Sequence, residues 1–268
     1  MQPSILSRRK FIQLSGAAMM PAGSTMAQPC QAAVRWIDYR SHGPFQIQAS
    51  FPLASYLPLF QELSALELEL QRTLAVPPAE RSINIYLLND QQSHRELLHK
   101  LYPNVPYRRA LYVQRGGVGS VYAYRHFELD IDLRHECTHA LLHANLPMVP
   151  LWLDEGLAEY FEMPPLARSF DHPHLQKLRW NMRFGMVRSM EELEACHDLS
   201  NMGAVEYRFA WAWVHFMLHG PLLAHRALVH FLADIRHGNP PGVLSDRMVA
   251  HYPKPKQQLS QHFKNWHR

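Results

Sequence analysis

The chain has 268 residues, of which 47% are hydrophobic and 19% charged, a balance typical of a globular protein with a substantial core. Its formal net charge is +4, but the first 27 residues hold three basic residues and no acid, which leaves 24 basic and 23 acidic residues. A nearly neutral remainder without a basic stripe argues against nucleic-acid binding. Because no apolar run reaches about 18 residues, the sequence predicts no transmembrane helix.

The N-terminal segment is basic and then weakly apolar. Ser7–Ile12 (SRRKFI) resembles the start of a twin-arginine export signal, and Thr25–Ala27 (TMA) resembles a cleavage site of small residues. We therefore expect a signal peptide at residues 1–27, a mature chain that starts at Gln28, and a periplasmic or otherwise exported location. An ordinary basic N-terminus is the alternative.

The three cysteines are too few for a disulfide framework and lack zinc-knuckle spacing. In an oxidising compartment Cys30 and Cys196 could form a disulfide, although nothing in the sequence fixes the distance between them. Cys137 falls inside a predicted helix, where we expect a small buried apolar residue.

Residues 28–129 predict a mixed lobe with a small sheet. Alternating, β-branched or aromatic runs indicate strands, and Gly116-Gly117 marks the turn of a hairpin. Leucine and charged residues at helical spacing indicate helices. The predicted strands are 33–39, 46–51, 82–88, 110–114 and 119–124, and the predicted helices are 56–74 and 92–102.

Residues 130–268 predict a mainly helical lobe, which makes residues 28–268 a single α+β domain. Ser189 and Glu192 have the spacing of a capping box at the start of one helix. The predicted helices are 130–144, 151–162, 172–183, 189–196, 204–219, 221–236 and 242–250.

The segment Arg134–His143 contains the pattern H-E-x-x-H. On a helix, residues four apart lie on one face, so His135 and His139 can bind the same ion. Glu136 is rotated by about 100° from His135, which places its carboxylate beside the ion, where it can take a proton from a water molecule. The pattern therefore predicts two metal ligands and a general base, although two surface histidines on a helix could produce the same spacing.

A second motif follows at Leu151–Phe161 (LWLDEGLAEYF). It resembles the W-L-x-E-G-x-A-x-Y motif of gluzincin (peptidase MA-like) metallopeptidases, which follows their H-E-x-x-H helix. The resemblance implies a zincin-like α+β fold, one Zn²⁺ ion per chain, and Glu155 as the third metal ligand. With two histidines and one glutamate as ligands, the fourth zinc position stays open for water.

Two further residues near these motifs have alternative interpretations. Glu159, one turn after Glu155, could hold the second nitrogen of a ligand histidine or could be an exposed helix residue. His143 has the wrong context for the third ligand of a metzincin, because Leu142 and Asn145 stand where that motif needs Gly and His. We exclude His143 as a ligand and assign it no role.

Gluzincins stabilise the tetrahedral oxyanion with a tyrosine or histidine from a later helix. The resemblance implies Tyr207 for this role, with His215 as the second choice. The alternative for both is a packing role. The strand 119–124 precedes the metal helix and is expected to be an edge strand that pairs with extended substrate.

These features predict a zinc-dependent hydrolase of peptide bonds that acts on a peptide or protein substrate. The chain lacks the G-x-M-E-N motif of the aminopeptidase N family, which favours an endopeptidase over an exopeptidase. The alternative is a non-catalytic zincin-fold binding protein of the cell envelope, although a binding protein would have no need of Glu136.

Overall fold

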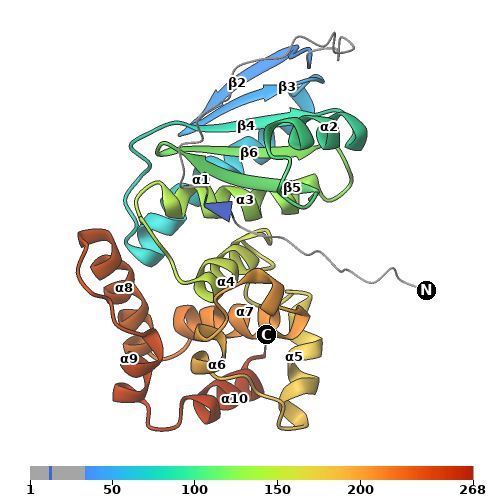
Figure 1. The fold of residues 1–268 in the computed structure, drawn as a ribbon. Helices are drawn as coiled ribbons and strands as arrows, with labels where there is room; N and C mark the ends of the chain where they lie inside the picture. Colours follow the sequence, from blue (N-terminus) through green and yellow to red (C-terminus); the bar gives the residue numbers. More distant parts are fainter. Residues whose placement is uncertain (1–11, 14–33, 268) are drawn as a thin grey trace.

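The computed structural model describes residues 12–13 and 34–267. The chain forms a β-sheet at one end and a group of helices at the other, with α3 and α4 between them (Figure 1). The predicted α+β class is therefore confirmed. The predicted signal peptide, apart from Ile12 and Gln13, and Cys30 with its predicted disulfide lie outside the described residues.

The sheet is mixed and has the strand order β1-β5-β6-β4-β3-β2. The pairs β2–β3 and β5–β6 are antiparallel, whereas β3–β4, β4–β6 and β1–β5 are parallel. Gly116 and Gly117 both have positive φ and close the β5–β6 hairpin as predicted. The strands are β1 (Ile12–Gln13), β2 (Asp38–His42), β3 (Phe45–Ala49), β4 (Ile83–Leu88), β5 (Ala110–Arg115) and β6 (Val118–Tyr124).

Two predictions about strands were wrong. The predicted strand 33–39 starts too early, because Trp36 and Ile37 precede β2 and the side chain of Ile37 is half exposed. The strand expected to be an edge, β6, lies inside the sheet between β5 and β4. Its side chains Val121, Tyr122 and Ala123 are buried on both faces, as a central strand requires.

The two faces of the sheet carry different helices. Helices α1 (Leu57–Leu74) and α3 (Leu129–His143) pack on one face, and α2 (Gln91–Leu101) packs on the other. Along β5, Ala110 and Tyr112 therefore belong to the core shared with α3, while Leu111 and Val113 pack with α2. This alternation fixes which side chains of β5 face the H-E-x-x-H helix.

Helix α4 (Leu151–Phe161) packs on α7 (Ala204–His219), and the contact depends on Gly156. A Cβ atom at Gly156 would lie 2.7 Å from the carbonyl oxygen of Ala210. The glycine therefore lets the two helix backbones approach closely.

The other helices complete the lower end in Figure 1. The capping box of Ser189 and Glu192 at the start of α6 is confirmed. Helix α10 was not predicted. These helices are α5 (His174–Arg183), α6 (Met190–Glu194), α8 (Leu222–His237), α9 (Leu244–His251) and α10 (Pro255–Asn265), with 3-10 turns at Ala54–Tyr56 and Leu199–Asn201.

Within the part of the chain that the structure describes, no helix is long and apolar enough to cross a membrane.

Candidate metal centre

Helices α3 and α4 bring together the three residues predicted to bind a metal. One ligand atom from each of His135, His139 and Glu155 lies within 4.8 Å of the others, and all three side chains are buried. The two Nε2 atoms of His135 and His139 are 3.2 Å apart, and Nε2 of His135 is 3.6 Å from Oε2 of Glu155. Ligands about 2.1 Å from a tetrahedral zinc ion are roughly 3.4 Å apart, so these separations fit such an ion.

A carboxylate lies beside the second nitrogen of each histidine. Nδ1 of His135 is 2.9 Å from Oε2 of Glu162, and Nδ1 of His139 is 3.0 Å from Oδ2 of Asp154. A carboxylate at Nδ1 favours the proton on that nitrogen, so the lone pair is on Nε2. This arrangement favours the ring orientation and the neutral tautomer that metal binding requires.

Neither of these carboxylates was identified from the sequence. The candidate for this role, Glu159, instead has its carboxylate 3.0 Å from Nε2 of His174 on α5. Its oxygen still lies within 4.8 Å of ligand atoms of His135 and Glu162. Glu162 is two helical turns after Glu155 and therefore on the same side of α4, which is the signal that could have identified it.

Asp154 also contacts His143, the residue to which the sequence assigned no role. Oδ2 of Asp154 is 3.1 Å from Nε2 of His143, and all of Asp154 is buried. Burial raises the pKa of Asp154, but the adjacent His139 and His143 outweigh it and hold that pKa well below its usual range. Asp154 is therefore a buried negative charge that fixes two histidines of α3 from α4.

Glu155 has a different environment. Both of its carboxylate oxygens are buried and accept no hydrogen bond from the described residues. Burial raises the pKa of Glu155 to about 8 when only protein surrounds it. A buried carboxylate needs a compensating partner, and a cation between the two Nε2 atoms would supply one.

Glu136, the predicted general base, is 5% exposed and lies against β5. The backbone N–H of Tyr112 donates a 2.8 Å hydrogen bond to Oε2 of Glu136. The ring of Tyr112 faces those of His139 and His143, with ring centres 6.4 and 6.1 Å apart. Strand β5 therefore lies next to the candidate site. The sequence had predicted the strand 119–124, which is β6, in this position.

Arg108 is a residue of this site that the sequence did not reveal. It is 6% exposed and lies two residues before Ala110, the first residue of β5. Burial lowers the pKa of Arg108, whereas electrostatic interactions with Glu136, Tyr207 and Glu155 raise it. A buried guanidinium thus lies within electrostatic reach of the base and of a candidate metal ligand.

The two candidates for oxyanion stabilisation lie in different surroundings. Tyr207 is in the first turn of α7, close enough to Arg108 to influence its pKa. His215 is fully buried two turns later, where its ring nitrogens are 3.0 Å from Nε2 of His262 and 3.1 Å from the carbonyl oxygen of Ser169. Tyr207 therefore lies near Arg108, whereas His215 is surrounded by α10 and the segment before α5.

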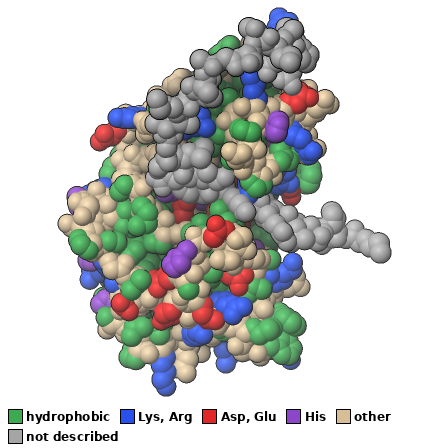
Figure 2. Space-filling view, viewed as in Figure 1, with side chains coloured by type: hydrophobic (Ala, Val, Ile, Leu, Met, Phe, Trp, Pro, Cys, Tyr) green, Lys and Arg blue, Asp and Glu red, His purple; other side chains and the backbone are tan. Residues whose placement is uncertain are grey.

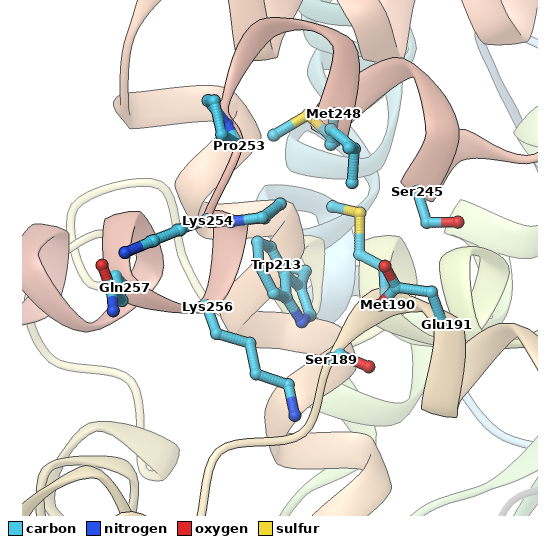
Figure 3. A pocket seen from close by; sticks show the side chains of 12 residues that line it. Ser189, Met190, Glu191, Trp213, Ser245, Met248, Pro253, Lys254, Lys256 and Gln257 are labelled. Carbon is cyan, nitrogen blue, oxygen red and sulfur yellow. The ribbon is translucent and has the colours of Figure 1, made fainter.

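A separate cavity of about 400 Å³ lies between α6, α7, α9 and the segment that enters α10 (Figure 3). Trp213, Met190 and Met248 point into it, and Lys254 and Lys256 lie at its rim (Figure 3). None of its lining residues is a candidate metal ligand, so this cavity is not part of the metal centre.

Comparison with known proteins gives no family for this chain: no protein-family model matches it, and no curated protein sequence matches it significantly.

Proposed function

We propose that the protein is a zinc-dependent hydrolase of peptide bonds, with His135, His139 and Glu155 as metal ligands and Glu136 as general base. The observation that carries the proposal is the arrangement of the two imidazoles. Each has a carboxylate at Nδ1, and their Nε2 atoms meet 3.2 Å apart beside the buried Glu155. Two surface histidines with coincidental spacing would have no reason to be buried and oriented in this way.

The chemistry of the ligands favours zinc. Two imidazoles and one carboxylate, with one further position open, are the ligands of catalytic zinc sites. A bound zinc ion would supply a Lewis acid that polarises a carbonyl group and makes water more acidic. The resemblance of Leu151–Phe161 to the second gluzincin motif supports the same ligand set.

Glu136 is placed to move protons. The hydrogen bond from Tyr112 N–H orients the carboxylate of Glu136, which could accept a proton from a water molecule and return it to the leaving amine. Because β5, the strand that carries Tyr112, lies beside the site, a substrate bound next to it would have its carbonyl groups close to Glu136.

Arg108 and Tyr207 are the candidates to stabilise the developing oxyanion. A guanidinium donates several hydrogen bonds in a fixed plane and keeps its charge even when buried, so Arg108 can hold a substrate carbonyl or the oxyanion. Tyr207 can add a neutral O–H donor. The electrostatic interactions of Arg108 with Glu136 and with Tyr207 support placing both residues on the same reaction.

The predicted twin-arginine signal would place this activity outside the cytoplasm, and the missing G-x-M-E-N motif favours an endopeptidase. Both are parts of the proposal that rest on sequence alone.

The test combines metal analysis with a peptide-library cleavage assay for the wild type, His135→Ala and Glu136→Gln. We expect about one zinc per chain in the wild type and in Glu136→Gln, none in His135→Ala, and cleavage by the wild type only. Zinc without cleavage of any peptide would favour the non-catalytic binding protein, and a wild type that binds no metal would overturn the proposal.

A further inference from the structure

Helix α5 and the turn after it expose large apolar side chains. Trp180, Phe184 and Met186 are 57%, 60% and 43% exposed. The rings of Trp180 and Phe184 pack against each other with centres 4.8 Å apart. In Figure 2, hydrophobic side chains gather at the lower right, where the end of α5 lies in Figure 1.

The fold holds these side chains in this position. Leu175, Leu178 and Asn181 bury the opposite side of α5, and the amide oxygen of Asn181 accepts a 2.6 Å hydrogen bond from Arg208 of α7. The N–H of Met186 donates to the carbonyl oxygen of Asn181 at 2.9 Å, across a turn in which Gly185 has φ of 72°. The exposed residues therefore belong to an ordered element whose inner side is already packed.

The surroundings of this apolar group are positively charged. Residues 172–190 contain four basic residues and no acid. Lys177 and Arg183 are exposed on α5, and neither forms an ion pair within the described residues. Arg188, by contrast, is paired with Glu192 and Glu206, so its charge is balanced.

We propose that the α5 face, made of Lys177, Trp180, Arg183, Phe184 and Met186, binds the surface of an anionic lipid bilayer. Tryptophan and phenylalanine favour the boundary between headgroups and acyl chains, and lysine and arginine at their rim attract anionic headgroups. The bilayer would accept the apolar side chains without requiring a matched protein surface.

The size of the α5 face favours a bilayer over a protein partner. A stable protein interface buries about 800 Å² on each partner, and three partly exposed side chains supply far less. A membrane surface needs only a few inserted side chains and unbalanced basic charge. This inference is independent of the proposed peptidase activity, since no residue of the α5 face lies in the metal centre.

The first experiment is co-sedimentation of the full chain with vesicles of phosphatidylcholine, with and without 30% phosphatidylglycerol. The wild type should bind the anionic vesicles only. Trp180→Ala/Phe184→Ala should lose most of this binding. Lys177→Glu/Arg183→Glu removes two positive charges, each of which contributes about fivefold, so binding should weaken at least about 25-fold. The basic leader is the same in all variants, so its contribution cancels.

Matched controls change the same properties elsewhere. Leu222→Ala/Leu223→Ala removes two exposed apolar side chains of α8, and Arg72→Glu/Lys100→Glu reverses two exposed charges of α1 and α2. Both should bind like the wild type. Thermal unfolding of every variant checks that it remains folded.

Tryptophan fluorescence supplies an independent measurement. Anionic vesicles should shift the emission of the wild type to shorter wavelength, and Trp180→Phe should lose the shift while it still sediments. Equal binding by the wild type and Trp180→Ala/Phe184→Ala would overturn the proposal, as would no binding to either vesicle. It would also be overturned if the wild type formed dimers that Trp180→Ala/Phe184→Ala converted to monomers.

Discussion

Oδ2 of Asp154 lies 3.1 Å from Nε2 of His143, and the same oxygen is 3.0 Å from Nδ1 of His139. One buried carboxylate of α4 therefore holds two histidines of α3. Such a carboxylate fixes the direction in which a ligand imidazole points and increases its basicity. It also makes the metal centre part of the contact between the two helices.

Replacing Asp154 should therefore affect both metal binding and stability. In Asp154→Asn the buried charge next to two histidines disappears, so we expect zinc affinity to fall by about 10- to 100-fold and the free energy of unfolding by about 3–5 kcal/mol. Competition with a chromophoric chelator measures the affinity, and urea denaturation measures the stability. Wild-type zinc affinity in Asp154→Asn would contradict the role assigned to this residue.

The two acidic residues at the end of α4 allow a direct comparison. Glu162 contacts the ligand His135, whereas Glu159 contacts His174. We expect Glu162→Gln to lower zinc affinity by about tenfold or more and Glu159→Gln to leave it close to that of the wild type. Both variants remove one negative charge, one from the last turn of α4 and one from the residue that follows it, so general electrostatics cannot explain a difference. A larger loss of zinc affinity in Glu159→Gln than in Glu162→Gln would support the hypothesis that Glu159 holds a ligand histidine.

The sequence predicted the elements with strong local signals. The helix at 204–219 and the capping box of Ser189 depend on short-range patterns, and both agree with the structure. The edge position of β6 was wrong, because alternation identifies a strand but does not determine its neighbours. Helix α10 was missed, since its only buried residues are Leu259 and Phe263.

The candidate site shows the same limit. His135 and His139 could be predicted from their spacing on one helix, and Glu155 could be predicted from a short motif. Arg108 comes from a different element, the residues before β5, and its approach to Glu136 depends on how the sheet packs on α3. Long-range packing of this kind leaves no signal in a single sequence.

Arg108 should be needed for turnover and not for metal binding. If its guanidinium holds the oxyanion, Arg108→Ala should lower kcat/KM by about 100- to 1000-fold at unchanged zinc content, and Arg108→Lys should recover only part of the loss. Arg115→Ala, an exposed change at the other end of β5, is the control. Full activity in Arg108→Ala would show that this arginine is structural.

Gly156→Ala should weaken the contact between α4 and α7. The added Cβ would lie 2.7 Å from the carbonyl oxygen of Ala210 and 3.1 Å from a methyl group of Val214. Relief of this overlap requires movement of a helix backbone, so we expect a loss of about 1–3 kcal/mol and a Tm lower by several degrees. Differential scanning calorimetry measures the change, and an unchanged Tm would show that the helices separate without cost.

Stability should also depend on pH through His94 of α2, which is fully buried. Burial lowers its pKa from 6.5 to about 4 in the folded protein. The unfolded chain binds the proton more readily, so this contribution to stability is complete above pH 6.5 and is lost progressively as the pH falls towards 4. The loss from this residue amounts to about 3 kcal/mol.

In His94→Phe no proton can bind at this position, and the rings of Tyr107 and Tyr124, with centres 5.7 and 5.3 Å from that of His94, provide an aromatic environment for the new ring. The free energy of unfolding of the variant, measured with urea between pH 7 and 4.5, should therefore fall less steeply than that of the wild type. His99→Gln, at an exposed position of the same helix, should follow the wild-type curve. Parallel curves for His94→Phe and the wild type would show that burial of His94 does not control the acid sensitivity of the fold.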